Sequence, residues 1–169
     1  MKKPNIKKDI IDNFGNRLRT RVNGLLIQDN KLLMVKHRMD TDHWFWNVPG
    51  GGMNFGQDAK ENLQREFLEE TGLGIEVGDY LFVHEFLEPP LHAIELFFEV
   101  SQTNGKLEVG IDPELETNKQ VIEEVKFLSI EEIKKIPSDK KHALFGRINS
   151  LKDVRIWKGY FNFGNKCIK

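Results

Sequence analysis

The amino-acid sequence predicts a single α+β domain, and three observations lead to that fold class. Five apolar stretches have the composition of β-strands. One segment, residues 58–71, combines helical spacing with signals for both of its ends. The chain has 169 residues, 39% of them hydrophobic, which is enough for a substantial core, and it contains no repeat, low-complexity tract or linker. We therefore expect an N-terminal extension over residues 1–18 and one domain over residues 19–169.

The composition argues against several classes of protein. The formal net charge of -1 and the pI of about 6.5 leave no basic excess that would attract nucleic acid. Cys167 is the only cysteine, so an intrachain disulfide is impossible and a reducing compartment is favoured. The N-terminus lacks the apolar region of a signal peptide, and no apolar run approaches the roughly 18 residues of a membrane span. We expect a cytoplasmic protein that binds neither a membrane nor nucleic acid.

The predicted strands are rich in apolar residues and are bounded by turn-forming residues. They cover residues 19–28, 31–38, 76–88, 91–100 and 121–128. Asp29-Asn30 suits a tight hairpin turn between the first two strands, which are apolar enough for burial on both faces. In the fourth strand, alternate residues from Ile94 to Val100 are apolar, whereas the other face includes Glu95. We expect the face of Ile94 to be the more buried one.

The C-terminal part of the chain is predicted to contain two helices and a packed tail. Ser129 and Glu132 form a capping-box pattern at the start of the segment IEEIKKI. A second helix is expected over about residues 139–151, and the aromatic tail from Val154 to Lys169 is expected to pack on the domain.

A longer helix is predicted over residues 58–71, because this segment has a cap at each end and an apolar stripe. Asp58 suits the N-cap position, and Gly72 suits the left-handed conformation that ends a helix. The stripe consists of Ala59, Leu63 and Phe67. We expect this stripe to face the core.

Three glutamates of this helix lie close to the stripe. At roughly 100° per residue, Glu70 lies about 40° to one side of Glu66 and Glu69 about 60° to the other. Glu66 and Glu70 lie at the edge of the stripe, where carboxylates repel one another and lose hydration. A hard divalent cation with oxygen ligands would relieve both costs. The alternative is an ordinary acidic helix face that pairs with Arg65 and Lys60.

A turn of three glycines, residues 50–52, precedes this helix and follows Pro49. Glycines expose backbone groups and allow close approach of a ligand. Magnesium held by carboxylates and a backbone carbonyl usually keeps its other positions for water and phosphate oxygens. The turn and the helix together indicate phosphate-ester or phosphoanhydride chemistry.

From Gly51 onward, these residues resemble the signature of the Nudix hydrolases, G-x5-E-x7-R-E-U-x-E-E-x-G-U, in which U is bulky and apolar. Arg65-Glu66, Glu69-Glu70 and Gly72-Leu73 stand at the matching positions of this box, which covers residues 51–73. One position departs from the signature, since Gln57 replaces the first glutamate. Gln57 has no charge, which bears on the number of metals bound or on the support of the loop.

The resemblance implies an α/β/α sandwich with a mixed, mainly antiparallel sheet. It also implies metal-dependent hydrolysis of a phosphoanhydride in a nucleoside diphosphate linked to another moiety, such as a nucleotide sugar or an ADP-ribose-like compound. Glu66, Glu69, Glu70 and the Gly50 carbonyl would hold Mg²⁺ or Mn²⁺. Glu66 is our first choice for the general base, and Arg65 would orient it. Many members of the family form dimers, so a homodimer is a further expectation.

Candidates for substrate contacts lie outside the box. Trp44 or Phe45 is expected to stack on a nucleobase, although the neighbouring aromatics have an alternative role in the core. Arg38, at the end of a strand, is a candidate for phosphate contact. Glu114 and Glu116 lie in a long polar loop, and the resemblance makes them candidates for further acidic groups.

Two other functions remain as alternatives. The first is a nucleoside triphosphate pyrophosphohydrolase, which would release pyrophosphate. The second is a nucleotide-sensing domain with little turnover, and the departure from the signature at Gln57 motivates this hypothesis. Pro89 lies where some ADP-ribose-cleaving members have a proline, but Pro89-Pro90 also reads as a plain turn. The 5 histidines show no metal-ligand spacing, so loop or packing roles are expected for them.

Overall fold

The computed structural model describes residues 11–12, 14–39, 43–111 and 121–164. Its strands are β1 (Arg17–Leu25), β2 (Ile27–Gln28), β3 (Lys31–Arg38), β4 (Trp44–Asn47), β5 (Gly50–Gly52), β6 (Leu73–Glu88), β7 (Leu91–Gly105), β8 (Ile122–Leu128) and β9 (Gly159–Phe161). Its helices are α2 (Ala59–Thr71), α3 (Ile130–Lys135) and α4 (Asp153–Ile156), with 3-10 turns η2 (Ser138–Lys140) and η3 (Ala143–Gly146).

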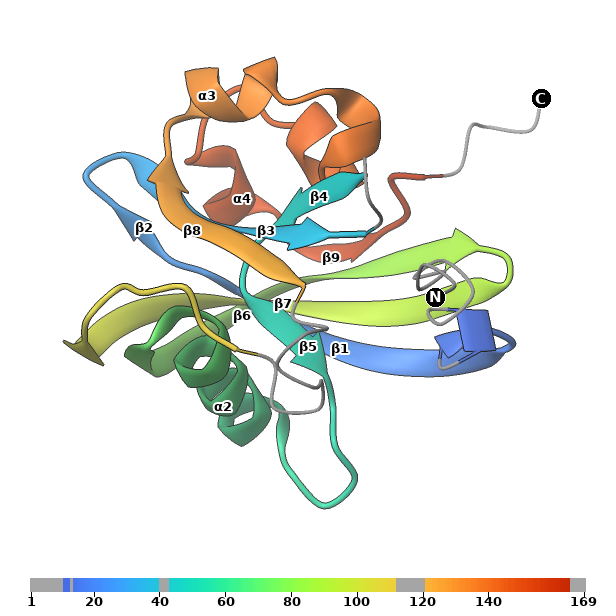
Figure 1. Ribbon diagram of the computed structural model, residues 1–169. Helices are drawn as coiled ribbons and strands as arrows, with labels where there is room; N and C mark the ends of the chain where they lie inside the picture. The colour runs from blue at the N-terminus through green and yellow to red at the C-terminus, as the bar shows by residue number, and fades with distance from the viewer. Residues whose placement is uncertain (1–10, 13, 40–42, 112–120, 165–169) are drawn as a thin grey trace, which may run out of the picture.

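The strands form two sheets in the middle of the molecule, and helices cover their outer sides (Figure 1). The first sheet has the order β5-β1-β7-β6-β9, and the second joins β2, β3 and β4, with β8 beside β3. Helix α2 lies on one side, and α3 and α4 lie on the other. The predicted α+β class and its α/β/α layers are therefore confirmed, with the strands divided between two sheets.

The strand pairs follow the sequence patterns closely. Asp29 and Asn30 have φ angles of 48° and 57° and join β2 to β3 as the predicted hairpin. The first predicted strand is interrupted at Leu26, which separates β1 from β2. Strand β1 is parallel to β7, and β6 is parallel to β9, whereas the other pairs are antiparallel. The sheets are therefore mixed and mainly antiparallel, as expected.

Helix α2 has the boundaries that its sequence predicts. The Asp58 side chain accepts hydrogen bonds from two backbone N–H groups of the first turn, and Gly72 ends the helix with a φ of 71°. Leu63 and Phe67 are fully buried, and Ala59 packs at the edge of the same cluster. This cluster joins α2 to one face of the strands, so the predicted stripe is confirmed.

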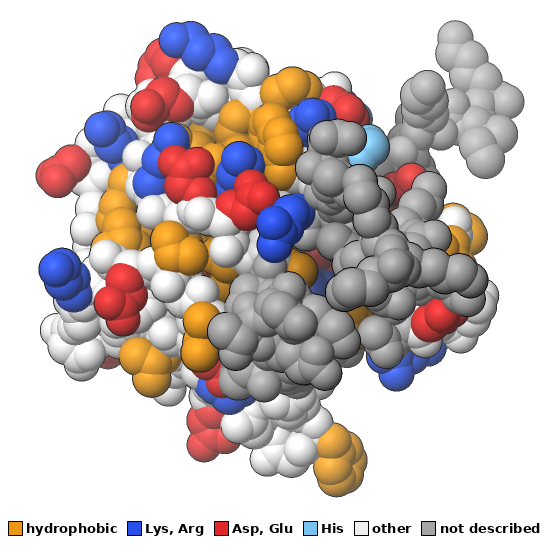
Figure 2. Space-filling model, viewed as in Figure 1, with side chains coloured by type: hydrophobic (Ala, Val, Ile, Leu, Met, Phe, Trp, Pro, Cys, Tyr) orange, Lys and Arg blue, Asp and Glu red, His pale blue; other side chains and the backbone are white. Residues whose placement is uncertain are grey.

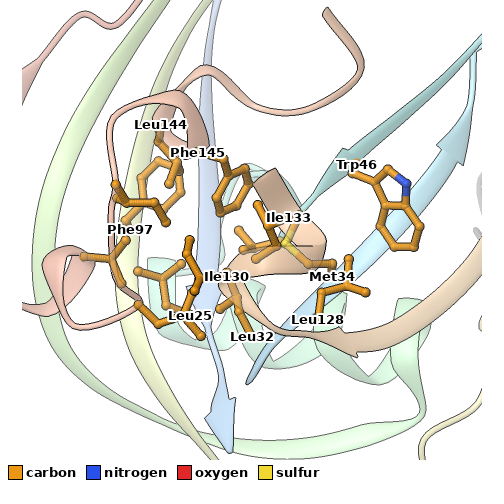
Figure 3. Close-up of a cluster of buried hydrophobic side chains, with 14 of the residues drawn as sticks. Leu25, Leu32, Met34, Trp46, Phe97, Leu128, Ile130, Ile133, Leu144 and Phe145 are labelled. Atoms are coloured by element: carbon orange, nitrogen blue, oxygen red, sulfur yellow. The ribbon is translucent and has the colours of Figure 1, made fainter. Parts of the chain in front are cut away.

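A second core lies on the opposite face of the strands (Figure 3). Its members come from the strands, from α3 and from η3, and include Leu25, Met34, Phe97, Ile133 and Phe145. The tail also contributes, because Trp157, Phe161 and Phe163 pack against this cluster and β9 pairs with β6. The expectation of a packed tail is confirmed for the described residues.

The helix expected over residues 139–151 is wrong. This segment forms η2, η3 and turns instead, and α4 begins only at Asp153. The backbone N–H of His142 donates to the carbonyl of Trp46 at 3.0 Å, and Lys141 forms a bridge with the same residue of β4. Pairing with a strand uses backbone groups that an α-helix would need, so the apolar spacing here arises from short turns over the core.

The expectation that Glu95 lies on the less buried face of β7 is also wrong. Glu95 is 5% exposed, whereas Ile94 is only half-buried. Both faces of β7 are covered, because the two cores lie on opposite sides of it. The polar partners of Glu95, described below, make its burial possible.

The surface carries both signs of charge, and acidic and basic side chains are interspersed on the face shown in Figure 2. Among the described residues, no helix is long and apolar enough to cross a membrane. The boundary between an extension and a domain at residue 19, the cytoplasmic location and the homodimer stay predictions.

Candidate functional site

The glycine turn forms strand β5, which brings the start of the box against β1. Gly50 pairs with Asn23 and Gly52 with Arg21. The φ of Gly50 is 152°, and a Cβ at this position would lie 2.1 Å from the carbonyl oxygen of Val22, so glycine is required here. The N–H of Gly50 donates to Oε2 of Glu70 at 2.9 Å. This hydrogen bond ties the last box glutamate to the turn that carries the predicted carbonyl ligand.

Glu66 lies directly over Gly51. A Cβ on Gly51 would lie 2.3 Å from the carboxyl carbon of Glu66, so the carboxylate occupies the space that this glycine leaves open. The Glu66 side chain is 14% exposed. Burial raises its pKa, and the neighbouring Arg65 opposes this shift without reversing it. The sequence prediction that Glu66 lies at the edge of the core is confirmed.

Arg65 links the carboxylates of the box and the residue that departs from the signature. Its Nη2 lies 2.7 Å from Glu66 and its Nη1 lies 2.7 Å from Glu69. Its Nε donates to Oε1 of Gln57 at 3.4 Å. Gln57 therefore supplies a neutral acceptor to Arg65, which supports the loop before α2 without the carboxylate that the signature has at this position.

Asn62 belongs to this site, although sequence reasoning missed it. It is fully buried on α2, accepts the N–H of Asn54 at 3.0 Å and donates to the carbonyl of Gly52 at 3.1 Å. It also accepts from Arg65 at 3.2 Å. The sequence does contain one indication of this role, because Asn62 is adjacent to Leu63 of the apolar stripe. A polar side chain that is buried there must form hydrogen bonds.

The chain returns to the C-terminal end of α2 after β7. The N–H groups of Glu108, Gly110 and Ile111 donate to the carbonyls of the last helical turn at 3.0–3.1 Å. These carbonyls have no partner within the helix itself. The polar loop thus starts beside Glu69 and Glu70, but the predicted Glu114 and Glu116 lie outside the described residues.

The other predicted substrate contacts lie on the neighbouring strands β3 and β4. Arg38 lies 3.9 Å from Glu123 of β8. Trp44 is half-buried, and Lys36 and Lys140 place their ammonium groups 5.1 Å and 4.6 Å from its ring. Phe45 is also half-buried and pairs with His37. Their roles in substrate binding stay predictions.

His37 connects β3 to the box. Its Nε2 lies 3.9 Å from Oε1 of Glu70. Burial and the positive charge of Arg21 lower the pKa of His37 to about 4, so the ring is neutral near pH 7. Arg21 itself lies close by, since its Nη2 is 3.5 Å from the carbonyl oxygen of Gly50.

The donors of the box suit a hard divalent cation. They are three carboxylates and one backbone carbonyl, and the bare backbone at Gly51 leaves room for the Glu66 carboxylate. In the structure, Arg65 bridges Glu66 and Glu69, and Glu70 is held by the turn. The chemistry of the donor set fits the predicted cation, and the assignment of each ligand stays a prediction.

Two of the histidines belong to a second polar cluster, inside the core. His84, Glu95 and His142 place their nitrogen and oxygen atoms within 4.8 Å of one another, and all three are buried. Oε2 of Glu95 lies 2.8 Å from each histidine, and Oε1 lies 3.6 Å from Nε of Arg21. Burial alone would raise the pKa of Glu95, but His142, His84 and Arg21 together hold it well below its usual range.

Comparison with known proteins adds two relatives of similar sequence. The ADP-ribose pyrophosphatase of Methanocaldococcus jannaschii is 27% identical over 139 residues, which cover 81% of this chain and 73% of that protein. The Bacillus subtilis (strain 168) protein YjhB, provisionally named an ADP-ribose pyrophosphatase, is 32% identical over 96 residues. That match covers 54% of this chain but only 45% of the length of the relative.

Solved structures and a family model agree with the architecture. A NUDIX hydrolase from Nitrosomonas europaea superposes with a TM-score of 0.68 at 18% identity, covering 82% of this chain and 88% of that one. A UDP-X diphosphatase superposes with a TM-score of 0.62 at 18% identity, covering 92% and 73%. Both likenesses concern the fold. The model of the NUDIX domain matches residues 17–146, and the chain therefore belongs to the Nudix family.

Proposed function

We propose that this protein is a metal-dependent hydrolase that cleaves the phosphoanhydride of a nucleoside diphosphate linked to another moiety. The carboxylate of Glu66, buried over Gly51 and held by Arg65 at 2.7 Å, is the observation that carries the proposal. Members of the Nudix family generally use divalent metals. Both relatives described above have names that refer to ADP-ribose, which makes ADP-ribose and nucleotide sugars the first substrates to test.

The residues of the box have distinct roles in this proposal. Glu66, Glu69, Glu70 and the Gly50 carbonyl hold Mg²⁺ or Mn²⁺. The bound cation supplies charge stabilisation for phosphate oxygens and lowers the pKa of water. Glu66 accepts a proton from the attacking water, and Arg65 orients its carboxylate. Asn62 keeps the loop before α2 in place through Gly52 and Asn54.

A panel of nucleotides separates this function from its alternatives. ADP-ribose, UDP-glucose and the nucleoside triphosphates are incubated with Mg²⁺ or Mn²⁺, and the products are identified by mass spectrometry. Release of two monophosphate-bearing products is the expected result. Pyrophosphate released from triphosphates would instead support the alternative of a nucleoside triphosphate pyrophosphohydrolase. Tight nucleotide binding without turnover of any compound would support the sensing alternative.

The fit between Gly51 and Glu66 offers a matched pair of variants. Gly51→Ala places a methyl group where the Glu66 carboxylate lies, so we expect kcat/KM to fall about 10²–10³-fold. Gly52→Ala is the control, because its Cβ would meet only the tip of Arg19 at 3.7 Å. Its activity should match the parent protein. Equal activity in both variants would remove Glu66 from the proposed mechanism.

Folding must be checked in the same two variants. The three heavy atoms nearest to the Gly51 methyl all belong to the flexible end of Glu66, so the thermal midpoint should move by no more than about 4 °C. Glu66→Gln serves as the reference for a lost general base and should lower turnover about 10²–10⁴-fold.

A further inference from the structure

Arg21 lies in a row of residues that crosses the first sheet. Strand pairing places Arg21 opposite Gly52 on one side and opposite Glu95 on the other, and it places Glu95 opposite His84. Residues that face each other across neighbouring strands project from the same side of a sheet. The row therefore runs from the glycine strand of the box to a histidine that is 1% exposed.

Two histidines fix the orientation of the Glu95 carboxylate. His84 and His142 both contact its Oε2 at 2.8 Å. Nδ1 of His142 accepts the N–H of Leu144 at 3.2 Å, so the ring carries a proton on Nε2, the atom that faces Glu95. Each ring thus donates to the same carboxylate oxygen, and the other oxygen is left to face Arg21 at 3.6 Å.

These contacts argue against a metal ion in the cluster, although the spacing of its three ligand atoms suits one. A metal on Nε2 of His142 would replace the proton that the Leu144 contact places there. Arg21 also compensates the charge of Glu95 already, so this carboxylate needs no cation for charge balance. The cluster is better suited to holding Arg21.

The outer end of Arg21 lies at the box. Its Nη2 is 3.5 Å from the carbonyl oxygen of Gly50, and its side chain is 25% exposed. Among the described residues, no hydrogen bond or ion pair involves its Nη1. Arg21 is close enough to act on the charges of both Glu66 and His37. Arg21 therefore has a donor available beside the carbonyl that is proposed to bind the cation.

We propose that Arg21 binds a phosphate of the diphosphate substrate and that Glu95, fixed by His84 and His142, positions Arg21 for this contact. The proposal rests on the hydrolase function proposed above. A guanidinium presents a planar fork that matches two phosphate oxygens. Because this fork lies beside the Gly50 carbonyl, one diphosphate reaches both Arg21 and a cation held by the box.

Steady-state kinetics of Arg21→Gln test the proposed contact between Arg21 and the phosphate. The assay uses the substrate that the parent protein turns over best. Loss of a charge-assisted hydrogen bond should raise KM about 10- to 100-fold and leave kcat within about threefold. Affinity for Mn²⁺ without substrate, measured by electron paramagnetic resonance, should not fall. Arg21→Lys should recover part of the lost KM, since it keeps the charge but not the fork.

Arg155→Gln is the matched control, because Arg155 of α4 forms an ion pair with Glu99 of β7 at 2.8 Å. Within the described part of the chain, no hydrogen bond or ion pair joins Arg155 to the box. Its KM should equal that of the parent protein. A KM for Arg21→Gln within twofold of the parent would overturn the proposal while leaving the hydrolase function intact. A loss of Mn²⁺ affinity with unchanged KM would also overturn it, because Arg21 would then support only the metal loop.

A double-mutant cycle tests the positioning role of Glu95. Glu95→Gln should raise KM, but it should add no further increase in a protein that already carries Arg21→Gln. Independent, additive effects on KM would overturn the positioning role. If the parent protein turns over no compound of the panel, calorimetric titration with ADP-ribose in EDTA replaces kinetics. Binding that Arg21→Gln weakens at least tenfold supports the proposal, whereas equal binding or no binding overturns it.

Discussion

Arg65 and Arg21 are both held by carboxylates, but the carboxylates come from different parts of the chain. Arg65 binds Glu66 and Glu69, which lie one and four residues away on the same helix. Arg21 binds Glu95, which lies on another strand. Both arginine side chains are 25% exposed, so the difference lies with their partners. Glu69 is 25% exposed, whereas Glu95 is 6% exposed.

Because of this difference in burial, the carboxylates around Arg65 can rearrange, whereas Glu95 is a fixed part of the core. Water screens an ion pair such as Arg65–Glu69, so its partners can exchange Arg65 for a cation at little cost. Glu95 has lost its hydration and depends on Arg21, His84 and His142 to compensate it. We therefore expect the box to adapt when a ligand binds, and the Glu95 cluster to stay as it is.

The largest effect is expected from removing the charge of Glu95. Glu95→Gln leaves Arg21 and two ring N–H groups facing an amide, so the free energy of unfolding should fall by about 3–5 kcal/mol. Glu69→Gln removes an equal charge at the more exposed pair and should cost less than about 1 kcal/mol. Urea unfolding of both variants measures the two values. Equal destabilisation would show that burial does not distinguish the two arginines.

A smaller effect is expected from the pH. The pKa of His37 is lowered from 6.5 to about 4 by burial and by Arg21, and the carboxylate of Glu70 at 3.9 Å does not offset these two causes. The unfolded chain therefore binds more protons than the folded one between these values, so stability decreases as the pH falls below 6.5.

The expected loss from His37 is up to about 2 kcal/mol between pH 7 and pH 5. Its window lies above that of Glu95, whose pKa is depressed and whose contribution is lost only as the pH falls below the ordinary carboxyl range. Urea unfolding of His37→Asn over this pH range should show a flatter profile than the parent protein. An unchanged slope would mean that His37 has the same pKa in the folded and unfolded states.

The smallest effect is expected at Gln57. Gln57→Glu restores the signature and offers Arg65 a carboxylate in place of an amide oxygen at 3.4 Å. An ion pair at this exposure contributes about 0.2–1 kcal/mol, so kcat/KM should change by less than about fivefold. Mn²⁺ titrations and turnover assays measure the result. A tenfold gain in Mn²⁺ affinity would instead indicate that position 57 faces the cation.

Much of the fold follows from patterns within short segments. The hairpin at Asp29-Asn30, the capping box at Ser129 and both ends of α2 agree with the structure, because backbone conformation and capping depend on residues a few positions apart. The segment 139–151 does not agree, because its backbone pairs with Trp46 of β4. The spacing of residues within the segment cannot predict a partner that is far away in the chain.

The candidate site divides in the same way. Helical periodicity alone places Glu66 and Glu70 at the edge of the core, and the structure confirms their burial. Asn62 was missed because its partners, Gly52 and Asn54, lie in the loop before the helix. The roles of Arg38, Trp44 and Phe45 stay predictions, as do those of Glu114 and Glu116, which lie outside the described residues.

The sequence by itself determined the box, its helix and the angular order of three carboxylates, because these depend on the fixed rotation of an α-helix. Only the tertiary structure decided that Arg21, Glu95 and His84 stand in one row and that His142, just before η3, contacts Glu95. Strand register and the packing of turns over a sheet bring together residues that are far apart in the chain. No pattern within a short segment predicts which distant residues will meet. Because Glu95 is buried, the stability of its charge depends on each of these partners.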